Sequence, residues 1–133
     1  MQSLRPQPLD PGQFYQQEVA RLPDGSRWIS QIPEPNPKNE NSCVAISYQI
    51  GQYNLDMVLL DVLARIAQEP MFSRLRTREQ LGYIVHVDSQ HASAGVQALI
   101  LLIQSDKYDP VYLQQRIEDF LAHFEVLVHV IVC

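Results

Sequence analysis

The sequence is poor in cysteine and in glycine, with two cysteines and five glycines among its 133 residues. Cys43 and Cys133 cannot build the disulfide framework of a small secreted domain, and neither belongs to a CxxC pair of the kind used for zinc or redox chemistry. The glycines are isolated from one another, so there is no glycine-rich phosphate loop. These absences exclude thiol-redox and phosphate-loop enzymes and favour a reducing compartment.

Positive charge is scarce as well. The 10 lysines and arginines face 15 acidic residues, a formal net charge of -5, and the only basic cluster runs from Arg74 to Arg78. Capture of nucleic acid or of an anionic membrane needs a larger basic surface. The longest apolar run, residues 98–103, is far shorter than the roughly 20 residues of a membrane-spanning helix. We therefore expect no nucleic-acid partner and no membrane partner.

No targeting signal is evident at the start of the sequence. Residues 1–13 are rich in proline and glutamine and lack the apolar centre of a secretory signal, and a single arginine makes a poor transit peptide. This favours a cytoplasmic location and leaves a mitochondrial one open. The same residues show no periodicity, which predicts an irregular lead-in before the first folded segment.

Apolar residues make up 46% of the sequence, which is enough for the core of one domain. An Asp-Gly pair within residues 23–26 predicts a tight turn between two candidate strands, residues 15–22 and 27–32. Three prolines within residues 33–41 predict a surface loop, because proline cannot donate to a strand ladder. Alternating apolar residues over 43–50 then predict a strand with both faces covered or nearly so.

Two helices are expected further on. The first begins at Asn54, ends at Pro70 and carries an apolar stripe at helical spacing, and residues 73–80 could add another turn or two. The second begins at Asp109 and Pro110, a favourable pair for a helix start. The apolar stripe of the first helix is Leu55, Leu59, Val62, Leu63 and Ile66, and that of the second is Leu113, Ile117, Phe120, Leu121 and Phe124.

Strand-forming residues at 83–87 and 96–103 flank a polar hairpin tip between the two helices. The complete order predicts an α+β fold, a mainly antiparallel sheet with helices packed on one face. Residues 125–133 abandon the amphipathic pattern for apolar, largely β-branched residues. Two interpretations of this atypical tail stay open: a final buried strand, or the end of a truncated or abnormally spliced chain.

Common catalytic patterns are absent. The four histidines form neither HExxH nor HxxEH, so we expect no metal site in this chain. No GxSxG turn presents a serine nucleophile. Cys43 lies in an apolar strand pattern, which predicts a structural residue. His86 in a strand and His91 at a hairpin tip are expected to be ordinary surface residues. We therefore assign no catalytic residue to this chain.

One polar, basic segment, residues 71–85, lies between two apolar elements. Arg76 offers a planar fork for a carbonyl or carboxylate, and Tyr83 follows Gly82 with its hydroxyl available. Together they could bind a peptide backbone and stabilise an oxyanion without transferring a proton. In the alternative, which the spacing alone favours, Arg74, Arg76 and Arg78 pair with Glu69 or Glu79 and Tyr83 is a core residue.

The same segment carries a resemblance. EPMFSRLRTREQLGYIV, followed by QALILLIQSDK, resembles the C-terminal part of the insulysin, nardilysin and pitrilysin family of zinc metalloproteases. The resemblance extends back through LPDGSRWISQIPEPNPKNENSCVAISYQIG and forward to about Phe124. It covers residues 14–124 and leaves out the lead-in, residues 1–13, and the tail, residues 125–133.

The resemblance implies a fold and a place within it. Enzymes of this family have two halves, each of two α+β domains, that close over a chamber, and the zinc and its HxxEH motif belong to the N-terminal half. This chain resembles the first part of the fourth domain, which contributes no metal ligand. Arg76 and Tyr83 correspond to family residues that reach the substrate near the scissile bond. The loop that holds them is then formed by Thr77, Glu79, Gln80, Leu81 and Gly82.

The function implied is that of a non-zinc-binding portion of a metalloendopeptidase that helps enclose and position peptide substrate. Its partners would be the peptide and the missing N-terminal catalytic half, in the same or a separate chain, and its zinc would be bound outside this chain. Alone it should be inactive. The alternatives are a non-catalytic module that binds peptides or a partner protein, and a splicing or gene-model remnant that never accumulates as a folded protein.

Overall fold

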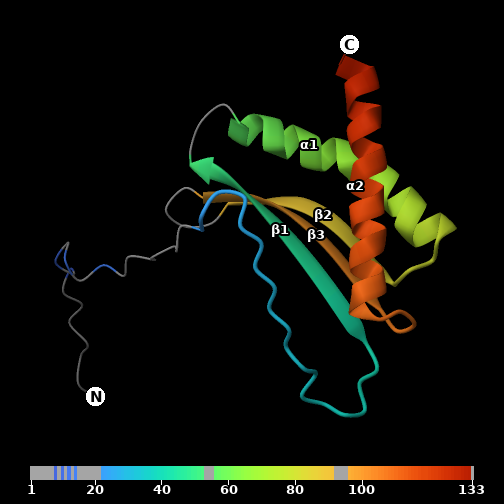
Figure 1. Cartoon of the computed structure of the whole chain (residues 1–133). Helices are drawn as coiled ribbons and strands as arrows, with labels where there is room; N and C mark the ends of the chain where they lie inside the picture. The colour runs from blue at the N-terminus through green and yellow to red at the C-terminus, as the bar shows by residue number, and fades with distance from the viewer. Residues whose placement is uncertain are drawn as a thin grey trace, which may run out of the picture.

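The computed structural model describes residues 22–52, 56–91 and 96–132, together with Pro8, Asp10, Gly12 and Phe14. Within these ranges, the side chains of residues 50–52, 56–57 and 126–132 are left aside. The described elements form one three-stranded antiparallel sheet and two long helices, which confirms the predicted α+β class (Figure 1). In chain order the elements are β1 (Ser42–Gln52), α1 (Asp56–Met71), the π-helical η2 (Phe72–Arg78), β2 (Ile84–His91), β3 (Val96–Ser105) and α2 (Pro110–Val132).

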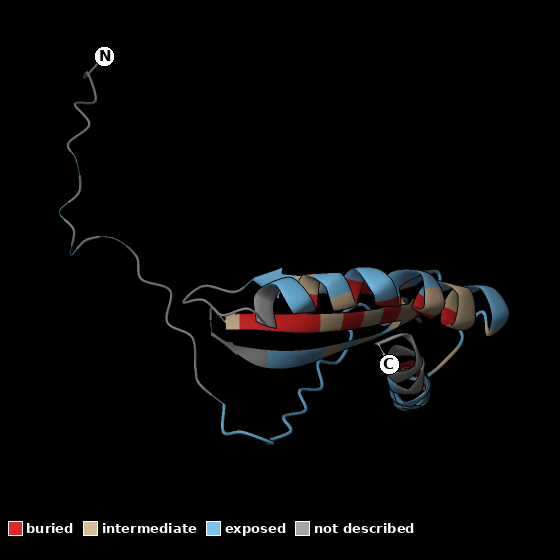
Figure 2. Cartoon of the chain, turned by 90° about the horizontal axis from the view of Figure 1, so that it is seen from above, coloured by how far each residue is buried: buried red, intermediate tan, exposed pale blue. Residues whose placement is uncertain are grey.

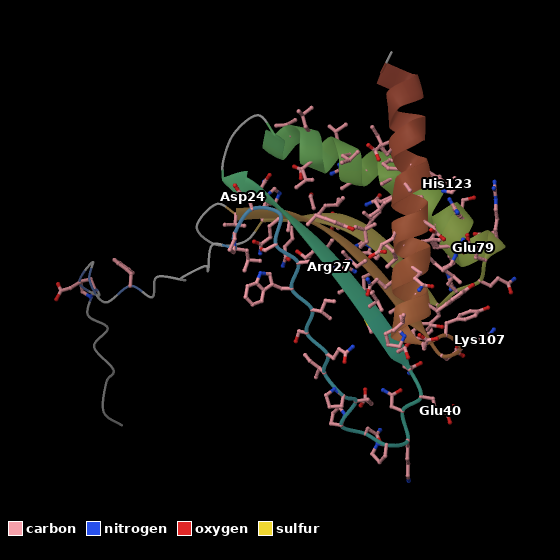
Figure 3. The ribbon with its side chains drawn as sticks, in the orientation of Figure 1. Asp24, Arg27, Glu40, Glu79, Lys107 and His123 are labelled. Atoms are coloured by element: carbon pink, nitrogen blue, oxygen red, sulfur yellow. The ribbon has the colours of Figure 1, made fainter. Side chains whose placement is uncertain are left out.

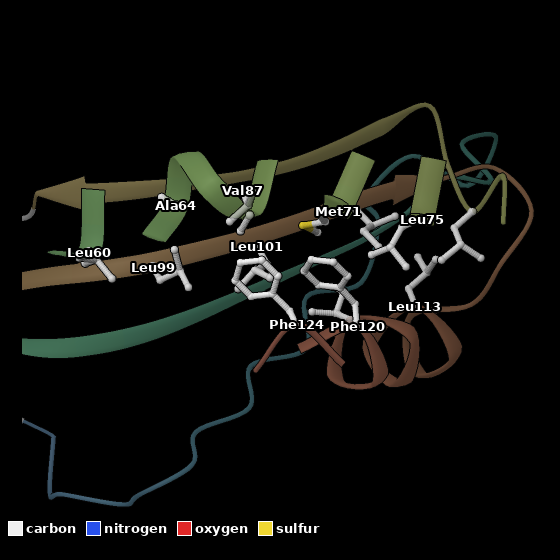
Figure 4. Close-up of a cluster of buried hydrophobic side chains, with 14 residues drawn as sticks. Leu60, Ala64, Met71, Leu75, Val87, Leu99, Leu101, Leu113, Phe120 and Phe124 are labelled. Atoms are coloured by element: carbon white, nitrogen blue, oxygen red, sulfur yellow. The ribbon is translucent and has the colours of Figure 1, made fainter. Parts of the chain in front are cut away.

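The strands lie in the order β1-β3-β2, so β3 is the central strand. In the observed register Ile46 of β1 and Val87 of β2 both face Leu101 of β3. Because side chains alternate across a sheet, these three residues share one face. Both helices contribute to the core over this face (Figure 4). The buried members of that core are Leu60, Ala64, Ala67, Met71, Leu75, Leu81, Val87, Leu99, Leu101, Ile103, Leu113, Ile117, Phe120 and Phe124.

The other face of the sheet is open at β1. Cys43, Ala45 and Ser47 are all exposed there (Figure 2). The expectation of a strand with both faces covered or nearly so is therefore wrong, and Cys43, expected to be a structural residue of an apolar strand, is exposed. The physical reason is that both helices pack on the opposite face, which an alternating sequence with small residues on one side cannot reveal.

Helix α1 has two apolar stripes, and the sequence singled out the wrong one as the core face. Leu59, Val62 and Ile66 are exposed, while the core is formed by residues that include Ala64 and Ala67. Small side chains on the inner stripe allow the helix to lie close to the strands. Leu63 is half-buried between the two stripes. The predicted start, with the Asn54 cap and Leu55, lies outside the described residues.

The helix ends combine confirmed and corrected predictions. Pro70 lies within the last turn of α1, one residue before its end at Met71, and the expected extra turns form η2. Asp109 caps α2, since its carboxylate accepts the N–H groups of Val111 and Tyr112 at 2.9 and 3.0 Å. The buried stripe of α2 is also confirmed, with Leu121 half-buried.

The alternative of a final strand over residues 125–133 is wrong, because α2 continues to Val132. Residues 125–132 contain no glycine or proline to interrupt the helical hydrogen bonds. Within the described part of the chain, no helix has the length and hydropathy needed to cross a membrane.

Residues 22–41 form an irregular, almost entirely exposed segment (Figure 2). The predicted turn is confirmed: the Ser26 N–H donates to the Pro23 carbonyl at 3.1 Å, and Gly25 has φ 72°. The prediction of a strand at residues 27–32 is wrong, since these residues are irregular and pair with none of the described strands. The other half of the expected hairpin, residues 15–21, lies outside them. The loop over residues 33–41 is confirmed.

Candidate functional site

The candidate site is the π-helical element η2 together with residues 79–83, the five residues that connect it to β2. We call these five residues the presentation loop. The loop leaves η2 at Glu79, whose N–H donates to the carbonyl of Arg74 at 3.0 Å, the wide i to i−5 spacing of a π-helix. Such turns are rare and recur at functional sites.

Arg76 is held against the presentation loop. Its Nη1 donates to the carbonyl oxygen of Gly82 at 2.5 Å, and its guanidinium carbon lies 5.9 Å from the centre of the Phe72 ring. The aromatic face attracts the cation, and the hydrogen bond fixes the direction of the fork. Arg76 is thereby brought to the residue immediately before Tyr83, with further guanidinium N–H groups available for another acceptor.

Glu79 ties the presentation loop to the helices. Its carboxylate accepts two hydrogen bonds from Arg116 of α2, both at 2.8 Å, and one from Arg74 at 3.1 Å (Figure 3). Asp119 accepts from the same Arg116 guanidinium at 2.7 Å. The side chains of Glu79 and Arg116 are only 22% and 23% exposed, so water competes weakly for this bidentate pair.

The pairing of Glu79 with Arg116 shifts the pKa of both groups. Hydrogen bonding from Arg116, supported by Arg74, lowers the pKa of Glu79 even though partial burial acts in the opposite direction. The Glu79 carboxylate in turn raises the pKa of Arg116. Both groups are therefore charged at neutral pH, and the bridge between them is intact.

The middle of the presentation loop is determined by backbone conformation and packing. Gln80 has φ 50°, the left-handed region that few residues other than glycine adopt. This turn directs Leu81 into the core, where its side chain is 1% exposed and its N–H donates to the Leu75 carbonyl at 2.9 Å. Leu81 thus anchors the middle of the loop in the core.

Gly82 is required by a close approach to β3. A Cβ placed on Gly82 would lie 2.1 Å from the backbone oxygen of Gln104. The next N–H, that of Tyr83, donates to the same oxygen at 3.1 Å. Glycine is the residue that lets two backbones come this close. The backbone of Tyr83, the last residue of the loop, is thereby held against β3 just before β2 begins.

Tyr83 is 45% exposed, so the alternative interpretation of it as a core residue is wrong. The alternative also expected the arginines to pair with acidic residues. This is correct for Arg74, which pairs with Glu79, but Arg76 donates to the backbone carbonyl of Gly82 instead. Of the other expected supports, Thr77 is exposed on η2. The structure therefore brings Arg76 and the backbone before Tyr83 together, and leaves the tyrosine side chain accessible.

Sequence reasoning missed Arg116 and Asp119. Arg116 lies 37 residues from Glu79 in the sequence and reads as one more charged residue on an exposed helix face. No local pattern could have identified it, because its role depends on how α2 packs over the sheet. Phe72 was likewise not singled out, although an aromatic residue four before an arginine on a helix is a recognisable pairing.

A second polar cluster lies at the other end of β2. Asp61 of α1 accepts a hydrogen bond from the Ser89 hydroxyl, and His91 Nε2 lies 3.6 Å from the same carboxylate. This is not a nucleophile activated by a base, since the carboxylate rather than the imidazole contacts the serine. His91 Nδ1 instead contacts the amide of Gln97 at 2.6 Å. The cluster pins α1 to β2.

The described residues provide no metal centre. No group of three or more histidine, cysteine, aspartate or glutamate side chains comes together among them. Zinc therefore does not fit the residues that the structure describes.

Comparison with known proteins places this site in a family. Residues 62–130 match the model of the PQQ synthase PqqF-like C-terminal lobe domain 4. The chain belongs to the insulysin and nardilysin family of metalloproteases. Insulin-degrading enzyme from Homo sapiens is 38% identical over 119 residues, which cover 89% of this chain and 11% of that protein. A nardilysin-like protein from Arabidopsis thaliana is 32% identical over 129 residues, 94% of this chain and 12% of that protein.

A third relative is the A-factor-processing enzyme of Saccharomyces cerevisiae, 37% identical over 106 residues, 77% of this chain and 10% of that protein. The chain thus spans about one ninth of the length of these relatives. In this insulysin-type family the matched region is a C-terminal domain of a larger protein, and the presentation loop lies within it.

Proposed function

We propose that this insulysin-type domain positions peptide substrate for proteolysis without providing the catalytic centre. It would help enclose the peptide against an N-terminal catalytic half, in the same or a separate chain, which would hold the zinc. The observation that carries the proposal is the presentation loop, which leaves Tyr83 accessible while Arg76 is fixed to the carbonyl just before it. We place this activity in the cytoplasm.

The chemistry of the two residues fits a peptide bond. The Tyr83 hydroxyl can donate to a carbonyl oxygen or accept from a backbone N–H, and the free N–H groups of Arg76 can donate to the next carbonyl. Both are donors that strengthen as negative charge develops on an oxygen, so they suit an oxyanion as well as a ground-state carbonyl.

Peptide binding by the 133-residue chain tests this proposal. One similar protein is named for degrading insulin, so the separated insulin B chain, labelled with a fluorophore, is a suitable first probe for fluorescence anisotropy. We expect Arg76→Ala to weaken binding about tenfold and Tyr83→Phe about threefold, as expected for lost hydrogen bonds. Arg27→Ala, in the irregular segment, is the matched control and should bind like the unchanged chain.

Unchanged affinity in both Arg76→Ala and Tyr83→Phe would refute the assignment of these residues. A separate assay addresses inactivity: the chain should leave the same peptide uncut after prolonged incubation. Hydrolysis that a chelator abolishes would contradict the absence of a catalytic centre.

A second function is favoured by the outer stripe of α1. Val58, Leu59, Val62 and Ile66 are exposed together on this helix, and apolar stripes of this kind commonly mark docking surfaces. In this alternative the chain is a module that docks on a larger partner protein. Val62→Glu with Ile66→Glu should then release the partner while leaving peptide binding intact; retention of the partner by this variant would exclude the stripe.

A further inference from the structure

β2 is an outer strand of the sheet among the described residues, since the order is β1-β3-β2. Outer strands present backbone N–H and C=O groups with no ladder partner, and these can pair with another extended segment. The edge of β2 begins at Ile84, the residue directly after Tyr83. It is therefore continuous with the candidate site.

Two hydrogen bonds show which residues of β2 direct their backbone groups outward. The Val87 carbonyl accepts from Gln68 Nε2 of α1 at 3.3 Å, and the Ser89 N–H donates to the Asp88 carboxylate at 2.9 Å. In an antiparallel strand the N–H and C=O of one residue point to the same side, and the side alternates along the strand. Val85 and Val87 therefore face away from β3, whereas His86 faces β3.

A groove of about 440 Å³ lies along this edge. Three residues of β2 line it, Val85, His86 and Val87, and the rest of its lining comes from α1 and η2, namely Arg65, Gln68, Glu69, Met71 and Phe72. An added strand would lie about 4.8 Å beyond β2. The groove is lined from both β2 and α1, and the side chain of Gln68 now makes the hydrogen bond that such a strand would make to Val87.

We propose that this groove binds an extended peptide segment as an additional strand on β2. The proposal rests on the proposed function and deepens it: the peptide held at Tyr83 and Arg76 continues along β2, and its backbone pairs with Val85 and Val87. Recognition is mainly of backbone, as in other strand-addition sites, and so tolerates many sequences. Arg65 and Glu69, which form no ion pair in the described part of the chain, select charged side chains on the helix side of the peptide.

Amide exchange measured by NMR tests backbone pairing directly. The probe is a capped synthetic peptide of alternating valine and threonine with one lysine and one glutamate. At saturating peptide we expect the exchange of the Val85 and Val87 amides to slow by about tenfold or more. The His86 amide, already directed at β3, is an internal control and should change little. Equal exchange at Val85 and Val87 with and without peptide would overturn the proposal.

A bulky side chain in the groove gives an independent test. Gln68→Trp should weaken binding of the same peptide about tenfold, while Val62→Trp, the matched substitution on the outer stripe of α1, should leave it unchanged. Gln68→Ala should strengthen binding, because it removes the competitor for the Val87 carbonyl. If Gln68→Trp and Val62→Trp bind the peptide equally well, no peptide lies in the groove.

These outcomes separate the two proposals. If Arg76→Ala and Tyr83→Phe weaken binding but Gln68→Trp does not, the groove is refuted and the proposed function stands. If only Gln68→Trp weakens binding, the groove stands and the role of the two side chains falls. No binding by the unchanged chain would refute both. Protection of the Val85 and Val87 amides that rises with protein concentration, without peptide, would assign the groove to a second copy of the chain instead.

Discussion

The presentation loop and residues 22–41 are both irregular segments, but they are held in different ways. Neither contains regular secondary structure, yet every residue of the loop except Gln80 has a contact that reaches another element. In residues 22–41 the hydrogen bonds are mainly local: Glu34, Asn36 and Asn39 hydrogen-bond with one another. A long-range contact of this segment is the ion pair of Arg27 with Glu118 at 3.0 Å, whose side chains are 64% and 45% exposed.

The presentation loop has a defined position because three of its residues are held from outside the loop. Leu81 is inserted in the core, Gly82 lies against β3, and Glu79 is bound to α2, so the three constraints come from three different elements. Sites placed on such supported positions keep their geometry better than sites on free loops. In residues 22–41, a local network of polar side chains defines turns but not a position on the protein.

The largest effect should come from Gly82→Ala. Its new Cβ would overlap the Gln104 backbone oxygen, so the loop must move away from β3, and we predict a loss of about 4 kcal/mol or failure to fold. Gly25→Ala is the matched change in the other segment, where nothing lies within 4 Å and only the φ of 72° is unfavourable. It should cost about 1 kcal/mol. Urea unfolding of both variants measures the two losses of stability, and equal losses would show that Gly82 is no more constrained than Gly25.

Removal of an apolar side chain should also destabilise the protein much more in the presentation loop than in residues 22–41. Leu81→Ala deletes a side chain that is 1% exposed and should cost about 3 kcal/mol through lost burial and the cavity left behind. Ile32→Ala removes a side chain that is 86% exposed and should change the free energy of unfolding by less than about 0.5 kcal/mol. A cost at Ile32 similar to that at Leu81 would mean that residues 22–41 are packed in solution.

The two ion pairs offer a finer comparison. A double-mutant cycle with Glu79→Gln and Arg116→Met should give a coupling energy of about 1 kcal/mol, because the pair is bidentate and partly shielded from water. The same cycle with Glu118→Gln and Arg27→Met should give about 0.3 kcal/mol or less, as exposed pairs do. Couplings of the same size would show that Arg116 does not fix the loop.

The smallest expected effect is the contribution of Glu79 to the pH dependence of the unfolding free energy. The lowered pKa of Glu79 means that its contribution to stability is complete above about pH 4.5, the ordinary value, and is lost as the pH falls through the lowered value in the folded state. The unfolding free energy of the unchanged chain should therefore approach that of Glu79→Gln as the pH is taken from 6 to 3. A difference between the two that stays constant over this range would contradict the bridge.

Much of the fold could be predicted from the sequence because it depends on local patterns. Alternation identified β1, the Asp-Pro pair identified the start of α2, and Asp24-Gly25 identified the turn. Predictions failed where tertiary packing decides. The outer stripe of α1 fits helical periodicity as well as the inner one, and nothing in the order of residues says which of the two the sheet covers.

The candidate site likewise combines features that local patterns predict with features that depend on tertiary packing. Arg76 and Tyr83 could be singled out from a basic segment beside a glycine, and family resemblance strengthened the choice. The need for glycine at position 82 arises from Gln104, and the partner of Glu79 is Arg116, both far away in the sequence. Sequence patterns therefore identified the residues that are presented, while the contacts that present them required the three-dimensional arrangement.

We expect the presentation loop, and not residues 22–41, to bind peptide. An NMR titration of the isotope-labelled 133-residue chain with the insulin B chain tests it most directly. We expect amide shift changes concentrated at Arg76, Gly82, Tyr83 and the first residues of β2, with none in residues 22–41. Changes confined to residues 22–41, or no changes anywhere at saturating peptide, would contradict it.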